Sequence, residues 1–289
     1  MTTLMPEENS KQLLLNGLEN RWKKYREELK RCHTEFSNEA VHDLRVAARR
    51  LLAFIQLLKS ISPRLRLKKL TRAFKDQLDE FDDLRDTQVI LAELSEILQD
   101  LPQLQEFQKY LQSEEQKLLR TLRKRIKKLD ISEVKKRIHK THEAIEEMDG
   151  DLESHILQAV DDAFLRVKQR YSAADIARPA TIHRVRVAFK SFRYMVEIIH
   201  PLLRNFPAEN IKRMNDYQSL MGEIQDAEVF TQTLADFSEH ASFSDPEPVR
   251  RYEDRRHTDA ISAYENQMNQ LVTFWRGEPD QPFPWERTA

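Results

Sequence analysis

The sequence predicts an all-α protein, and three observations support this. Glycine occurs only 4 times in 289 residues, so tight turns are scarce. Charged residues make up 33% of the chain, and most of the remainder are strong helix formers. Apolar residues recur at steps of three and four along almost the whole length, which is the spacing of helices packed in bundles. We therefore expect a helical content above roughly 70% and no sheet.

Short breaks divide this periodicity into nine helical segments. Ser37 or Asn38 is a suitable N-cap for the second segment, and Pro63 and Pro102 lie where the third and fourth begin. A Pro-rich tail follows the last segment. The predicted helices cover residues 8–34, 41–58, 63–99, 102–128, 133–147, 152–172, 180–203, 208–240 and 247–276.

Composition also limits the cellular setting. Cys32 is the only cysteine, so an intrachain disulfide is excluded. The first twelve residues lack the basic and apolar regions of a secretory signal. No run of 18 apolar residues occurs, and so we expect no transmembrane helix and no membrane partner. We expect a cytoplasmic protein.

The two halves of the chain repeat each other. The segment AVHDLRVAARRLLAFIQLL (40–58) aligns with TIHRVRVAFKSFRYMVEII (181–199) at an offset of 141 residues, and Asp86 aligns with Asp226 at an offset of 140. We expect two tandem four-helix bundles related by a pseudo-twofold internal repeat. Their predicted boundary falls at Gly150, giving domains 1–149 and 150–289.

Each repeated helix carries a basic stripe beside its apolar seam. The seam residues are Val41, Leu44, Ala48, Leu51, Ile55 and Leu58 in the first copy, and Ile182, Val185, Phe189, Phe192, Val196 and Ile199 in the second. One residue further on lie His42, Arg45 and Arg49 in the first copy, and His183, Arg186, Lys190 and Arg193 in the second. Side chains at the edge of a seam are half-buried, so their charges need partners.

Folding each repeated helix back onto its successor predicts those partners. The acids Asp82 and Asp86 should lie beside His42 and Arg45, and Asp226 beside His183. At the opposite end of the predicted helix pair, three basic side chains lie close together without a counterion, namely Arg49, Arg72 and Lys75. The second half offers a sparser set in Lys190, Arg193 and Lys212. Crowded cations favour a bound anion, and phosphate suits guanidinium groups.

The motifs VHDLRVAARRL and IHRVRVAFKSFRYMVE, with LRDTQV and IQDAEV after them, resemble those of the CHAD family, the conserved histidine α-helical domain. The resemblance spans roughly residues 8–276. It implies two four-helix bundles with a shared basic surface that binds inorganic polyphosphate and related phosphate anions. It also implies an association with polyphosphate granules. The chain holds no β-rich domain of the kind that often precedes a CHAD domain, so it resembles a stand-alone member.

Carried onto this sequence, the resemblance together with the stripes gives one set of expected polyphosphate-binding residues. Leu52 and Ser191 depart from the family pattern, because a basic residue is frequent at both positions. The expected set is His42, Arg45, Arg49, Arg50, Arg72, Lys75, His183, Arg186, Lys190, Arg193 and Lys212.

Other functions remain as alternatives. DDLRD (82–86) has the DDxxD form with which all-α isoprenoid synthases hold Mg²⁺ and a diphosphate, but the second half lacks it and its acids have predicted cationic partners. We therefore expect no catalytic residue, no metal site and no cofactor. Nucleic acid is disfavoured by the near-neutral net charge of -1 and by the scarcity of exposed aromatics. A protein-binding adaptor stays open. So does the role of residues 117–140, which carry eleven Lys or Arg against two acids.

Overall fold

The computed structural model describes residues 10–239 and 245–286, and within them it is 82% helical with no strand. The all-α prediction is confirmed. The described residues contain nine α-helices and four short 3₁₀ helices. The α-helices are α1 (Ser10–Thr34), α2 (Asn38–Ile61), α3 (Lys68–Ile97), α4 (Gln105–Lys128), α5 (Ser132–Glu146), α6 (Leu152–Ser172), α7 (Pro179–Ile199), α8 (Glu209–Ser238) and α9 (Glu247–Glu265).

Two helix starts follow the local chemistry that predicted them, whereas Pro63 lies in a turn before α3, which begins at Lys68 and not at Pro63 as predicted. The Ser37 hydroxyl accepts a hydrogen bond from the backbone N–H of Ala40 at 3.2 Å, so Ser37 is the N-cap of α2. Pro102 opens a 3₁₀ turn that leads directly into α4. The last predicted helix is shorter than expected, because α9 ends at Glu265 and a separate 3₁₀ helix covers Met268–Thr273. Residues 8, 9 and 240, which the prediction included in helices, lie outside the described residues.

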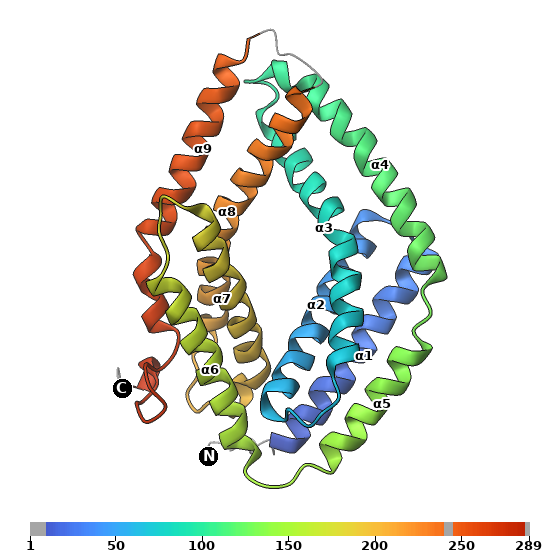
Figure 1. Cartoon of the computed structure of the whole chain (residues 1–289), viewed down its shortest axis with the longest axis vertical. Helices are drawn as coiled ribbons and strands as arrows, with labels where there is room; N and C mark the ends of the chain where they lie inside the picture. The colour runs from blue at the N-terminus through green and yellow to red at the C-terminus, as the bar shows by residue number, and fades with distance from the viewer. Residues whose placement is uncertain (1–9, 240–244, 287–289) are drawn as a thin grey trace, which may run out of the picture.

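The helices form a closed outline in which α5 links two sets of four (Figure 1). One set is α1 to α4 and the other is α6 to α9. The ends of α3 and α8 meet the starts of α4 and α9 at the upper apex of Figure 1, whereas α2 and α7 lie in the lower half. There α2 packs against α1, α3, α6 and α7, so α2 and α7 join the two sets. The pseudo-twofold relation between the sets stays a prediction.

The hydrophobic core is continuous across both sets of helices. Its main cluster runs from Leu13 in α1 to Trp275 after α9, and every residue of the two predicted seams is buried. A smaller cluster at the apex includes Phe107 and Phe230. The predicted boundary between residues 149 and 150 falls in the link between α5 and α6, and the core extends across it. No described helix is long and apolar enough to span a bilayer.

The close packing of α1 on α2 depends on Gly17. A Cβ atom at this position would lie 2.6 Å from Cε2 of Phe54, whose ring is fully buried. The contrasting position is Gly222 in α8, where the nearest atom to an added Cβ would be Nε of Arg186 at 3.7 Å, an ordinary contact. The first glycine is therefore required by packing, and the second is not.

This contrast gives a stability prediction. Gly17→Ala should lower the free energy of unfolding by about 1–2 kcal/mol, because overpacking costs more than the gain in helix propensity. Gly222→Ala should leave that energy unchanged or raise it by about 0.5–1 kcal/mol. Chemical denaturation monitored by circular dichroism measures both. Equal effects of the two substitutions would contradict the close approach of α1 to Phe54.

Candidate functional site

The basic stripes of α2 and α7 meet where the two helices pack against each other. Lys190 of α7 is half-buried and lies among arginines from both stripes. Burial first, and then the positive charges of four arginines, lower the pKa of Lys190 to about 6; the four are Arg49, Arg186, Arg45 and Arg193. Burial and the neighbouring Arg45 also lower the pKa of Arg49. The repeat therefore concentrates like charges at one place.

A cavity of about 1090 Å³ opens beside this cluster, and we name it the cationic pocket. Residues of α2, α3, α6 and α7 line it. None of the described residues in its lining is acidic. Its basic lining residues are Arg49, Lys59, Arg166, Arg170, Arg184 and Lys190.

The cationic pocket has a buried apolar floor and a charged rim. Ala53, Leu78 and Met195 line it and are buried, whereas Arg166 and Arg184 line it and are exposed. Leu52 and Ser191, the two departures from the family pattern, also line the pocket. Those two positions do not contribute charge, and the exposed basic lining residues come from elsewhere on α2, from α6 and from α7.

Two further arginines support the pocket from behind. Nη2 of Arg45 donates a hydrogen bond to Oδ1 of Asp82 at 3.0 Å, as predicted. Arg186 lies near Asp226, and burial lowers its pKa. The Nε atoms of both arginines are buried and have no hydrogen-bond partner among the described residues. Unsatisfied buried donors of this kind are costly unless a ligand or water completes them.

Arg193 plays a different part from the one predicted for it. Its side chain is buried and binds the carboxylate of Glu197, and its Nε donates to Oε1 of Gln218 at 3.0 Å. The guanidinium lies over the ring of Tyr194 at 4.5 Å, and Tyr194 in turn hydrogen-bonds to Arg49. Arg193 therefore positions Tyr194 and Arg49 and does not line the pocket.

The two histidines also differ from expectation. His42 is exposed. The His183 imidazole shares a hydrogen bond with the side chain of Gln225, and Asp226 lies beside Arg186 instead. Burial, followed by the nearby Arg186, lowers the pKa of His183, and Nδ1 is buried without a partner among the described residues.

The remaining predicted residues lie outside the cationic pocket. Arg72 pairs with Asp76 at 3.4 Å and Lys212 pairs with Asp216 at 2.6 Å, both at exposed positions. Lys75 is exposed too. The predicted register of α2 against α3 holds, because Thr71 and Leu78 line the pocket with Arg49, but α3 turns Arg72 and Lys75 away from it.

Sequence reasoning missed four of the six basic lining residues. Arg166 and Arg170 are one turn apart on α6, and that spacing was a usable signal. Lys59 lies near the end of α2, beyond the matched segment, and Arg184 lies directly after the stripe residue His183 on α7. The basic segment 117–140 contributes nothing to the lining. Its side chains include Lys117, Arg125 and Arg137, each of which pairs with a glutamate.

Arg50 lies in a second cavity, of about 520 Å³, which we name the N-terminal pocket. Residues of α1, α2 and α7 line it. Five of its lining positions are each 141 residues from a lining position of the cationic pocket; the pairs are 43 and 184, 46 and 187, 47 and 188, 50 and 191, and 197 and 56. The two pockets therefore occupy equivalent places in the repeat.

The acids of DDLRD have different neighbours. Asp82 pairs with Arg45. Burial, and then the charges of Asp82 and Asp226, raise the pKa of Asp86. The described residues contain no group of three or more His, Cys, Asp or Glu side chains that could hold a metal ion.

The depressed pKa of Lys190 predicts a pH-dependent stability. The unfolded chain has a lysine pKa near 10.5, so between pH 6 and about 10.5 it binds more protons at this residue than the folded chain. Lys190→Met should therefore raise Tm by about 2–4 °C at pH 6.5 without added anions, and this advantage should shrink as pH approaches 10. Calorimetric scans of both proteins across this range measure the difference. A pH-independent difference would show that Lys190 is ordinarily charged in the fold.

The comparisons with known proteins agree with this architecture. The family model for the CHAD domain matches residues 16–235. The crystal structure of the CHAD domain from the plant Ricinus communis is similar, with a TM-score of 0.68 and 17% sequence identity, over 94% of this chain and 92% of that one. A search of curated proteins gave no match. Because the family model covers well over half of its length, the chain belongs to the CHAD domain family.

Proposed function

We propose that this protein binds inorganic polyphosphate in the cationic pocket. The observation that carries the proposal is a pocket with six Lys or Arg residues and no acid among its described lining residues. Burial and neighbouring cations lower the pKa of Lys190 and of Arg49, which supports a site where added negative charge is favourable. An incoming polyanion relieves the repulsion between these cations, and phosphate oxygens accept the hydrogen bonds that guanidinium groups offer. The resemblance to CHAD domains implies the same ligand.

The arrangement of the cations suits a chain of phosphates better than a single one. The basic residues come from three helices, with Arg49 and Lys59 on α2, Arg166 and Arg170 on α6, and Arg184 and Lys190 on α7. Polyphosphate carries a charge on each unit of a flexible chain, so it can bridge cations that are held on separate helices. Binding is then multivalent, and long chains are favoured over orthophosphate.

The competing functions find less support. Tyr194 is the one aromatic residue among the described lining residues, and it already contacts Arg193, so the pocket offers no platform for successive bases. Of the acids that resemble a diphosphate-enzyme motif, Asp82 pairs with Arg45, and Asp86 lies near Asp82 and Asp226. We propose a binding protein without catalytic activity, which acts on phosphate polymers by holding them.

The site can be tested with two variants that each replace four basic residues. One replaces four pocket residues by glutamine, namely Arg49, Arg166, Arg184 and Lys190. The control replaces four exposed residues of α4 by glutamine, namely Arg120, Lys124, Lys127 and Lys128. Titration calorimetry with long-chain polyphosphate should show an affinity loss of at least about a hundredfold in the pocket variant, since each charge-assisted hydrogen bond contributes about 1.5 kcal/mol or more. The control should lose less than about threefold.

Two outcomes of this titration would count against the proposal. Equal losses in the two variants would mean that overall charge alone attracts the polymer. Unchanged affinity in the pocket variant, with circular dichroism showing an intact fold, would place the polymer elsewhere. In the wild type, affinity should fall steeply with salt because each contact releases counterions, and the pocket variant should show a shallower slope.

Lys190 also predicts that binding takes up a proton. With a pKa of about 6 its amine is mostly neutral at pH 7.5, and a bound polyanion favours the charged form. Calorimetry at pH 7.5 in two buffers with different ionisation enthalpies should show an uptake approaching one proton per site. Lys190→Met should abolish that uptake and leave binding detectable. Long-chain polyphosphate should be used, because only its few terminal phosphate groups titrate near neutral pH and the ligand then contributes little to the measured proton uptake. Uptake that persists in Lys190→Met would assign the proton to another group.

A further inference from the structure

The N-terminal pocket differs in charge from its repeat-related counterpart. Asp43 stands where the cationic pocket has Arg184, and Glu197 stands where it has Gln56. The remaining charged lining residues are Arg21, Lys24 and Arg50. The same place in the repeat therefore holds a purely basic pocket in one half and a mixed pocket in the other. A long polyanion would meet two carboxylates here, which disfavours it.

Two arginines line the N-terminal pocket, the half-buried Arg21 and the exposed Arg50. Arg21 lies over the ring of Phe54 at 5.2 Å, and its Nη1 donates to the backbone carbonyl of Gly17 at 3.1 Å. Burial, followed by the charge of Arg50, lowers the pKa of Arg21 to about 10. The two cations thus repel each other, and packing against Phe54 holds one of them in place. Such a pair suits one phosphate group, which can bridge both.

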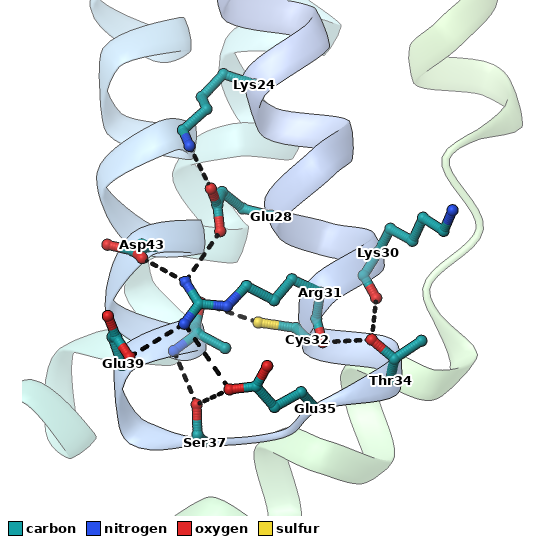
Figure 2. A network of polar contacts seen from close by, with 11 residues as sticks. Lys24, Glu28, Lys30, Arg31, Cys32, Thr34, Glu35, Ser37, Glu39 and Asp43 are labelled. Atoms are coloured by element: carbon teal, nitrogen blue, oxygen red, sulfur yellow. Dashed lines mark hydrogen bonds and ion pairs between the residues drawn. The ribbon is translucent and has the colours of Figure 1, made fainter.

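In each of the two carboxylates that line the N-terminal pocket, one oxygen accepts a hydrogen bond from an arginine. Arg31 donates to Oδ2 of Asp43 at 2.7 Å within the network that fixes the start of α2 (Figure 2). Oε1 of Glu197 binds Arg193. No described residue donates to Oδ1 of Asp43 or to Oε2 of Glu197. A carboxylate can accept several hydrogen bonds, so both residues can still accept from ligand hydroxyls.

We propose that the N-terminal pocket binds a small phosphate monoester of a polyol. Arg21 and Arg50 hold the single phosphate, and Asp43 and Glu197 accept hydrogen bonds from the hydroxyl groups. The volume of about 520 Å³ lies within the range of small-molecule sites. This site is separate from the cationic pocket, and its ligand class does not depend on polyphosphate binding there.

Titration calorimetry with glucose 6-phosphate, inorganic phosphate and glucose tests the site. The ester should bind more tightly than inorganic phosphate, and glucose should bind most weakly. Arg50→Gln, at an exposed position, should weaken ester binding by at least about tenfold, because it removes charge-assisted hydrogen bonds. The matched control is Arg184→Gln in the cationic pocket, which should leave ester affinity within twofold. Asp43→Asn should reduce the preference for the ester over inorganic phosphate.

Several results would overturn the proposal. They are no binding of the ester by the wild type, equal affinity for ester and inorganic phosphate, or an equal loss in Arg50→Gln and Arg184→Gln. Titration of Arg50→Gln with long-chain polyphosphate separates the two pockets, since its affinity should stay within twofold of wild type. A large loss there would join Arg50 to the polyphosphate site. That result would overturn the monoester proposal and leave the proposed function standing.

Discussion

The contact between α2 and α7 is the constraint on which the rest of the molecule depends. Both helices bury an apolar seam in one continuous core, and both carry a basic stripe one residue beyond that seam. Burying the seams fixes the rotation of each helix, so most side chains of the stripes are at least half-buried, with His42 as the exposed exception. Hydrophobic burial is far stronger than repulsion between partly screened cations, and it therefore holds Lys190 and Arg49 together. Folding energy is used to assemble a site that favours an anion.

The basic residues of the stripes differ in whether they have an acidic partner. Where a stripe residue has an acid within reach, the pair satisfies the charge, as with Arg45 and Asp82 or Arg193 and Glu197. None of the described residues that line the cationic pocket is acidic, and burial together with the neighbouring arginines lowers the pKa of Lys190 there. A neutral amine costs little to bury, whereas a charged one costs more. Burying Lys190 therefore makes the free energy of unfolding lower than it would be with an apolar side chain at this position.

Sequence could predict the parts of this structure that periodicity and capping decide. The seams, the Ser37 cap, the link near Gly150 and the Arg45–Asp82 pair all follow from spacing along one or two helices. The set of residues that line the cationic pocket could not be predicted in the same way, because it depends on how further helices pack against α2 and α7. α6 brings Arg166 and Arg170 to the rim, and α3 turns Lys75 away, and both facts follow from tertiary packing that no single periodicity encodes.

The two pockets show how equivalent places in a repeat can differ in charge. Equivalent positions line both cavities, so their backbone framework is shared. The difference in charge comes from a few side chains, chiefly Asp43 against Arg184 and Glu197 against Gln56. Glu197 also binds Arg193, which positions Tyr194 and Arg49 at the cationic pocket. The acid that makes the N-terminal pocket unsuitable for a long polyanion therefore also orders the basic pocket. One carboxylate serves both sites, and the α7 helix that carries it is the physical link between them.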